Sequence, residues 1–125
     1  MSRLLVDTQA LLWWLTDDSA LSATAREALA DPAIEPLVST ASVWEIAIKR
    51  SLGKLSAPDD LPERVSDEGF SWLAISPAHA WHVRDLPAHH RDPFDRLLIA
   101  QALTEQLPII TTDARFAEYG VETRW

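Results

Sequence analysis

Short apolar runs alternate along the chain with longer segments in which apolar residues recur every three or four positions. The short runs predict strands at residues 4–6, 37–39, 72–75, 109–111 and 121–124. The longer segments predict helices at residues 8–16, 22–30, 41–52, 63–68, 77–86, 94–106 and 114–119. Strands that alternate with helices in this way favour a three-layer α/β/α fold, in which helices flank a central parallel sheet.

The predicted helix at residues 8–16 is apolar around much of its circumference and carries Trp13 and Trp14. A helix of this kind is buried on more than one side or contacts a partner. Tryptophan is also enriched at protein–protein interfaces. We therefore expect some of the six tryptophans to pack in the core and others to contribute to an interface such as a homodimer.

The composition is that of one ordinary domain, residues 1–125, with enough apolar residues (47%) to bury a core. No stretch approaches the eighteen or more consecutive apolar residues of a membrane span, and the start of the chain does not resemble a signal peptide. The absence of cysteine excludes disulfides, thiolate metal ligands and cysteine nucleophiles. These features together predict a cytoplasmic protein that does not associate with a membrane.

Four acidic residues lie close to the points where predicted strands lead into predicted helices, namely Asp7, Glu45, Asp95 and Asp113. The carboxyl ends of parallel strands share one edge of the sheet, and open α/β sheets bind their ligands at that edge. Several carboxylates gathered there would repel one another unless a cation lay between them. The pattern therefore predicts a divalent metal site.

The donor set indicates which metal this site would hold. Carboxylate oxygens, without cysteine and without a histidine pair at ligand spacing, suit Mg²⁺ or Mn²⁺. Mg²⁺ usually takes only one or two protein carboxylates and completes its shell with water and substrate phosphate. The chemistry that such a site serves is phosphodiester hydrolysis, in which the metal activates a water molecule and offsets charge on the phosphate.

Each acid also has a structural interpretation. Asp7 and Asp113 could cap the helices that follow them, Asp92 could cap the helix at 94–106, and Ser42 with Glu45 matches a capping box. Glu45, however, lies in an otherwise apolar run, and a buried charge is costly unless it is paired or bound to metal. Caps also do not require a carboxylate each time, so the joint pattern favours the metal site.

The net charge of −8 argues against binding nucleic acid by simple electrostatic attraction. A nucleic-acid substrate would need local positive charge, and Lys49, Arg96 and Arg115 each lie close in sequence to one of the acids. They are candidate substrate ligands, although Lys49 has the i, i+4 spacing to pair with Glu45 instead. Thr111 could hold a carboxylate or a metal-bound water, or it could simply end a strand.

Two adjacent histidines, His89 and His90, fall in the predicted loop before the helix at 94–106. They lack the i, i+4 spacing with which two histidines on a helix bind a transition metal. We therefore expect both to be surface residues rather than metal ligands or a general base.

The chain resembles the PIN-domain family, and most closely its VapC-type toxins from bacterial toxin–antitoxin pairs. The resemblance spans nearly the whole chain, from residue 4 to the last predicted strand. The blocks that carry it occur in the order of the family, and they are residues 5–8 (LVDT), 42–49 (SVWEIAIK), 53–55 (GKL), 92–102 (DPFDRLLIAQA) and 110–113 (ITTD). Each block alone is a weak signal, whereas all of them together are a specific one.

The resemblance implies that residues 1–125 form a single PIN domain with metal-dependent endoribonuclease activity. It implies that Asp7 and Asp95 are the principal Mg²⁺ ligands and that Glu45 and Asp113 complete the acidic site, directly or through water. Thr111 matches the polar residue that precedes the last acid in the family. The resemblance also implies a homodimer, an RNA substrate and inhibition by a cognate VapB-like antitoxin. The RNA target, the number of metal ions and the identity of the antitoxin are not readable from the sequence.

Three other classes of protein are alternatives to the nuclease. A phosphoacceptor signalling domain or a dehalogenase-like phosphatase would need a second acid close to Asp7, but Gln9 occupies the relevant position. No lysine follows Lys54, although the signalling domain would need one late in the sheet. A catalytically inert PIN-like module that binds a protein partner is the remaining alternative, and the complete set of four acids argues against it.

Overall fold

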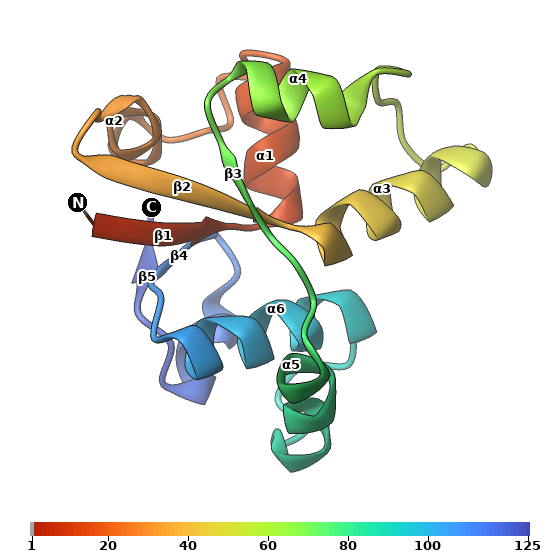
Figure 1. The fold of residues 1–125 in the computed structure, drawn as a ribbon, viewed down its shortest axis with the longest axis vertical. Helices are drawn as coiled ribbons and strands as arrows, with labels where there is room; N and C mark the ends of the chain where they lie inside the picture. The colour runs from red at the N-terminus through yellow and green to blue at the C-terminus, as the bar shows by residue number, and fades with distance from the viewer. Residues whose placement is uncertain (1) are drawn as a thin grey trace.

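Five parallel strands form the central sheet of the computed structural model, which describes residues 2–125 (Figure 1). The strands are β1 (Ser2–Val6), β2 (Ile34–Ser39), β3 (Ser71–Leu73), β4 (Ile109–Ile110) and β5 (Thr123–Arg124). Their order across the sheet is β3-β2-β1-β4-β5. The chain therefore moves outward from β1 in both directions, and the crevice at the carboxyl ends of β1 and β4 is the position at which such sheets bind ligands.

Helices cover both faces of the sheet, and the predicted three-layer arrangement is confirmed. The helices are α1 (Thr8–Leu15), α2 (Ala23–Ala30), α3 (Thr40–Ser51), α4 (Leu61–Asp67), α5 (Pro77–His82) and α6 (Pro93–Glu105), with the 3₁₀ helices η1 (Val83–Asp85) and η2 (Ala114–Tyr119). In Figure 1, α1, α2 and α4 lie above the sheet, while α5 and α6 lie below it. No helix within residues 2–125 has the length and apolar composition to cross a membrane.

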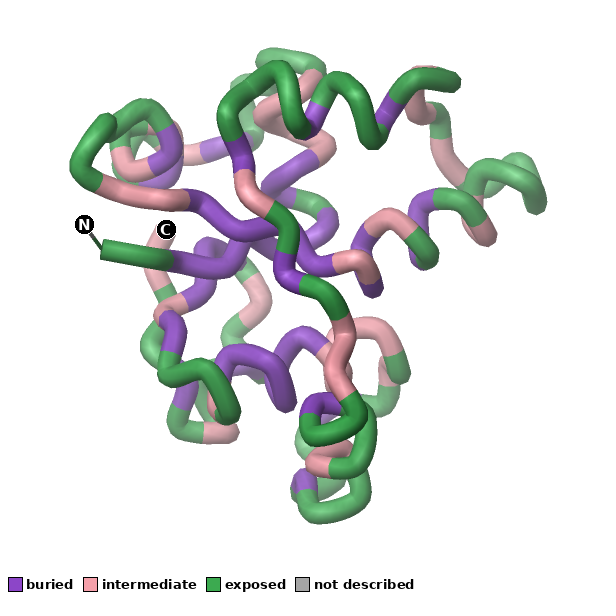
Figure 2. The backbone as a smooth tube through the Cα atoms, viewed as in Figure 1, coloured by how far each residue is buried: buried purple, intermediate pink, exposed green. Residues whose placement is uncertain are grey.

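Both faces of β1 are buried, as a parallel sheet covered on two sides requires. Leu4 and Val6 join one apolar cluster with residues of α1, α2 and α4. Leu5 points to the opposite face and joins a second cluster with residues of α6. Figure 2 shows buried stretches along the carboxyl halves of β1 and β2 and in the middle of α6. This double core holds the carboxyl ends of β1 and β4 in fixed positions.

Most predicted elements are present with ends shifted by one or two residues. The predicted helix at 77–86 is divided into α5 and η1, and it ends at Asp85 because Leu86 precedes Pro87 and adopts an extended backbone, as a residue before proline prefers. The helix predicted at 41–52 begins at Thr40 with Ser39 as its N-cap. The capping box expected at Ser42 is therefore wrong, and the Ser42 hydroxyl instead accepts a hydrogen bond of 2.9 Å from Thr8 in the core.

The two tryptophans of α1 pack within the chain. Trp13 lies 5.7 Å from the ring of Trp125, and Trp14 lies 5.9 Å from the ring of Phe70. Both remain half-buried, and Trp13 lines an open apolar hollow of about 540 Å³ along α1. The most exposed tryptophans lie elsewhere, at Trp44 and Trp81.

Candidate metal centre

Asp7 is the first residue after β1 and is almost fully buried. Its Oδ1 accepts a hydrogen bond of 2.7 Å from the backbone N–H of Ala10, so the predicted cap of α1 is confirmed. The pKa of Asp7 is raised to about 6, chiefly by burial. Hydrogen bonds from Thr111 and Ala10 oppose the rise, and the charges of Asp113 and Glu45 add to it. Capping and membership of an acidic site are therefore compatible, because the cap uses only one carboxylate oxygen.

Glu45 lies in the second turn of α3 and is only 5% exposed. Its Oε2 accepts a hydrogen bond of 2.6 Å from Nζ of Lys49, so the predicted i, i+4 pair is present. Its Oε1 is buried and has no hydrogen-bond partner among residues 2–125. A buried carboxylate oxygen without a partner carries a large desolvation cost, and this atom is the strongest sign that the site is built to receive a cation.

Asp95 lies in the first turn of α6, where Asp92 caps the helix by accepting hydrogen bonds from the N–H groups of Phe94 and Asp95. The cap predicted for Asp92 is confirmed. Burial, together with the negative charges of Asp92, Glu45, Asp7 and Asp113, raises the pKa of Asp95 to about 7. Carboxylates from four elements therefore act on one side chain, which means that the acids gather at one place.

Asp113 follows β4 and caps η2, as predicted. Its carboxylate accepts hydrogen bonds from the backbone N–H, the Nε and the NH2 group of Arg115, at 2.9 to 3.0 Å. Burial opposes ionisation, but these bonds and one from His90 outweigh it and lower the pKa of Asp113 below 3.8. The N–H of Asp113 in turn donates to the hydroxyl of Thr111 at 3.0 Å, so Thr111 contacts both Asp113 and Asp7.

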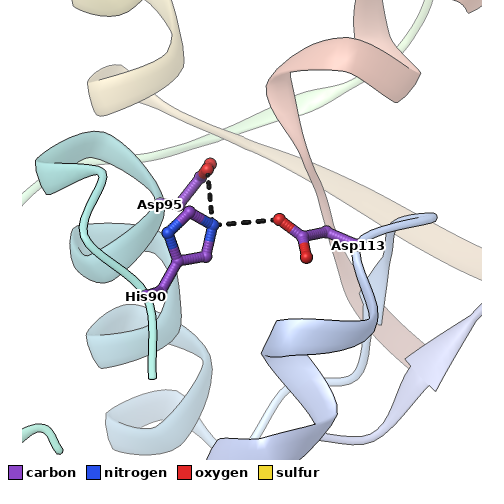
Figure 3. Close-up of side chains that lie close together, drawn as sticks. All are labelled: His90, Asp95 and Asp113. Carbon is purple, nitrogen blue, oxygen red and sulfur yellow. Dashed lines mark hydrogen bonds and ion pairs between the residues drawn. The ribbon is translucent and has the colours of Figure 1, made fainter. Parts of the chain in front are cut away.

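His90 lies between two of these acids (Figure 3). Its Nε2 is 2.9 Å from Oδ2 of Asp113 and 3.0 Å from Oδ2 of Asp95. Its side chain is 2% exposed, so the expectation that both adjacent histidines are surface residues is wrong for His90, whereas His89 is exposed. The expectation failed because the His90 ring packs against Phe116 and its backbone N–H donates to Tyr119, both from η2. One signal was available in the sequence, since His90 precedes the N-cap Asp92 by only two residues.

The sequence profile of the PIN domain matches residues 4–122. The chain belongs to the PIN domain family. No curated protein matches it.

Solved structures share the fold of this PIN domain at low sequence identity. A chain of VapBC2 from Rickettsia felis, bound to a promoter DNA fragment, is 10% identical and aligns over 98% of this chain and 97% of its own, with a TM-score of 0.70. A chain of DNA-bound VapBC from Salmonella typhimurium is 16% identical over 99% and 98%, with a TM-score of 0.67. A chain of a toxin–antitoxin complex from Klebsiella pneumoniae is 16% identical over 91% and 90%, with a TM-score of 0.56.

The acidic site of this PIN domain fits a divalent cation. PIN domains are generally nucleases that use divalent metal ions. Here the donors of the four predicted acids are all carboxylate oxygens, the donors that hard cations such as Mg²⁺ and Mn²⁺ prefer. Two of the acids have pKa values raised to about 6 and about 7, and Oε1 of Glu45 has no partner. Each of these conditions would be relieved by a bound cation.

Two of the predicted substrate ligands lie beside the acids in this PIN domain. A hydrogen bond to Glu45 raises the pKa of Lys49, with further contributions from the charges of Asp92 and Asp95. The pKa of Arg115 is raised by its hydrogen bond to Asp113 and by the same two charges. The side chains of Lys49 and Arg115 therefore both lie close enough to the acidic site to be affected by its negative charge.

Arg96 has a different environment. Its guanidinium donates to the backbone carbonyls of Val83, Leu86, Pro87 and His90 at 2.9 to 3.2 Å. These contacts tie the start of α6 to the loop after η1 and commit the guanidinium to the chain's own oxygens. Arg96 is therefore not among the residues that we propose for substrate binding.

The Arg96 contacts lead to a prediction about stability. Arg96→Met keeps the aliphatic stem but removes every donor, so four carbonyls lose their shared partner. We expect the free energy of unfolding to fall by about 2 kcal/mol, within the range for hydrogen bonds to charged groups. Urea denaturation measures the change, with Arg91→Met as the control, since Arg91 is exposed. Equal unfolding midpoints for the two variants would show that the hydrogen bonds of Arg96 contribute nothing to stability.

Proposed function

We propose that this chain is a metal-dependent endoribonuclease, the VapC-type toxin of a VapBC-like toxin–antitoxin pair. The convergence of four acids on the crevice beside β1 and β4 carries the proposal, with Oε1 of Glu45 left for a cation to satisfy. Membership of the PIN family supports it. The likeness to chains from VapBC complexes supports the toxin assignment.

Each acid has a proposed role. Asp7 and Asp95 hold Mg²⁺ or Mn²⁺, because burial and mutual repulsion raise the pKa values of these two carboxyls. Glu45 binds the cation through Oε1 or orients the attacking water, and Asp113 completes the site. When bound, the cation supplies Lewis acidity toward the scissile phosphate and lowers the pKa of water.

Lys49, Arg115 and Thr111 serve the substrate in this proposal. Lys49 and Arg115 supply the local positive charge that a phosphodiester needs on a protein with a net charge of −8. Both already contact an acid of the site, so each could contact a phosphate with little rearrangement. Thr111 is buried, bonds the carboxylate of Asp7 and accepts a hydrogen bond from the backbone N–H of Asp113, so it fixes the position of both residues toward the substrate.

The proposed partners are a VapB-like antitoxin and a second copy of this chain. An open apolar hollow of about 460 Å³ lies beside α3 and is lined by Trp44, Trp72 and Pro62, among others. Trp44 is 56% exposed and packs against Phe94, one residue before Asp95. A partner that covers this hollow would therefore lie next to the acidic site.

A cleavage assay tests the proposal. We expect the purified chain to cut single-stranded RNA with Mn²⁺ or Mg²⁺ and to stop when EDTA removes the metal. Glu45→Gln replaces one carboxylate oxygen of a proposed ligand by an NH2 group and removes its charge. It should slow cleavage by at least about 10- to 100-fold, the range for residues that support metal sites. Glu63→Gln is the matched control, because Glu63 is exposed on α4. Equal cleavage by both variants would assign the activity to a contaminating nuclease.

The alternative is a PIN-like module that binds a protein partner without catalysis. The exposed tryptophans are the observation that favours it. Calorimetric titration with Mn²⁺ separates the two functions, because the inert module has no reason to bind millimolar metal. Binding by the wild type, together with loss of binding in Asp7→Asn, would favour the nuclease.

A further inference from the structure

Contacts to the backbone N–H, the carbonyl and the ring fix the position of His90. Its backbone N–H donates to the hydroxyl of Tyr119 at 2.8 Å, and its carbonyl accepts from Arg96 at 3.2 Å. The ring packs edge-on against Phe116, with 5.9 Å between the centroids. A side chain that is buried and held at both backbone groups has little freedom to move, so the direction of its ring nitrogens is set by the fold.

The hydrogen bonds of the ring define its tautomer. The backbone N–H of Asp92 points at Nδ1 at 3.2 Å, and a backbone N–H can only donate. Nδ1 therefore accepts, and the ring proton of the neutral imidazole lies on Nε2. That single N–H lies between Oδ2 of Asp95 and Oδ2 of Asp113, which come from two different elements (Figure 3).

A nitrogen that carries a proton has no lone pair for a metal. His90, Asp95 and Asp113 have the spacing of a possible three-ligand site, since their donor atoms lie within 4.8 Å of one another. The bond from Asp92 nevertheless makes Nε2 a donor, and coordination through it would require an imidazolate. Hard cations do not select that ligand. The contribution of His90 to the site is therefore a hydrogen bond to Asp113 from an Nε2 that also lies 3.0 Å from Oδ2 of Asp95.

We propose that His90 is a positioning residue for the acidic site: its Nε2–H donates to Asp113 and lies against Oδ2 of Asp95, which keeps the two carboxylates at a fixed spacing while their oxygens alone bind the cation. This inference rests on the proposed metal site and adds a residue to it. Without the donor, two carboxylates from α6 and η2 would face each other with only repulsion between them. Their separation would widen, and the site would bind a cation more weakly.

Two variants separate the two ring nitrogens. His90→Asn places an amide oxygen where Nδ1 accepts from Asp92, but it removes the donor at Nε2. His90→Gln extends an amide N–H to the position of Nε2, but it gives up the acceptor at Nδ1. We expect His90→Asn to weaken Mn²⁺ binding by about 10- to 100-fold in calorimetric titration. We expect His90→Gln to restore binding to within a few-fold of the wild type.

RNA cleavage gives the second readout. In His90→Asn, the Mn²⁺ concentration for half-maximal cleavage should rise by the same factor as the dissociation constant, with the rate at saturating Mn²⁺ much less affected. A purely structural role would instead lower the melting temperature of both variants without a difference between them in Mn²⁺ affinity. That outcome, or unchanged affinity in His90→Asn, would overturn the proposal.

Spin-echo spectroscopy of the Mn²⁺-loaded wild type examines coordination directly. We expect no coupling from a directly bound ¹⁴N, and its presence would overturn the donor role by making His90 a ligand. The proposed nuclease function fails separately. The wild type could bind Mn²⁺ and the two variants could differ as expected while none of the three proteins cleaves RNA. That result would support the role of His90 and refute the ribonuclease assignment.

Discussion

Asp95→Asn is expected to slow RNA cleavage by more than about 100-fold, beyond the loss typical of residues that only support a metal site. The same variant is expected to melt at a higher temperature than the wild type in metal-free buffer at pH 8. The two effects have one cause, because the carboxylate that attracts a cation is also the one that its acidic neighbours destabilise. A substitution that damages the fold would lower both activity and melting temperature.

The sign of the stability change follows from the pKa of Asp95. Burial and four neighbouring acids raise that pKa from 3.8 to about 7, so the folded protein binds the proton more tightly than the unfolded chain. The resulting stability is fully present below about pH 4 and is lost as the pH rises to about 7. At pH 8 the ionised carboxylate is therefore a net cost, which an uncharged amide removes.

The size of the effect has an upper bound. Each pKa unit corresponds to about 1.4 kcal/mol, so a rise of about three units bounds the gain near 4 kcal/mol. The Asp95 side chain is 25% exposed, so water screens part of the penalty, and we expect a gain of about 1–2 kcal/mol. For a domain of this size that corresponds to about 4–8 °C in melting temperature. Calorimetry measures it, with exposed Asp67→Asn as the control.

Asp7→Asn extends this experiment. Asparagine keeps an oxygen that can accept from Ala10, so the cap of α1 is retained while the charge is lost. We expect a similar loss of cleavage and a smaller rise in stability, since the pKa of Asp7 is raised only to about 6. Wild-type cleavage rates in both variants would refute the assignment of these two acids to the metal site.

Mn²⁺ is expected to stabilise the protein strongly at pH 8 and very little at pH 5. At pH 8 both Asp7 and Asp95 are ionised and repel each other, and a cation between them replaces that repulsion with attraction. At pH 5 both carboxyls are largely protonated, so metal must compete with protons. At a hundred times its dissociation constant, Mn²⁺ adds about 2.7 kcal/mol by binding linkage, or about 10 °C in melting temperature.

The metal-free protein should show the complementary trend. Its stability should fall between pH 5 and pH 8 as the two raised carboxyls ionise. Asp113 behaves in the opposite sense, because its pKa lies below 3.8, and its contribution is lost only under more acidic conditions. Melting curves across this pH range, with and without Mn²⁺, measure both trends. The double variant Asp7→Asn/Asp95→Asn should flatten them, and a Mn²⁺ response that persists in it would place the metal elsewhere.

Much of the site was predictable from the sequence because its parts are local. Asp7 directly follows one short apolar strand and Asp113 closely follows another. Parallel strands bring their carboxyl ends to one edge of a sheet. The proline after Asp92 and the periodicity beyond it likewise predict α6 and the position of Asp95 in its first turn. Glu45 was identifiable because a charge inside an apolar run needs a partner.

Side-chain environments that depend on distant parts of the chain were not predicted. Arg96 is adjacent to Asp95 in sequence, yet its guanidinium is directed to four carbonyls of residues 83–90. His90 was expected at the surface, yet Tyr119 and Phe116, nearly thirty residues later, enclose it. Neither outcome has a periodic signal, because the loop that carries His90 is shaped by side chains from α6 and η2.

The sequence by itself determined the layered α/β fold, the edge of the sheet where the acids gather and the class of cation that their oxygens would bind. These properties follow from hydrophobic period, strand direction and donor chemistry, which act over a few residues at a time. Only the tertiary structure decided which basic side chains lie beside the acids, which oxygen of Glu45 has no partner and toward which residues the His90 ring donates. Those properties depend on angstrom-scale distances between side chains from separate elements, and such distances exist only after the whole core has packed.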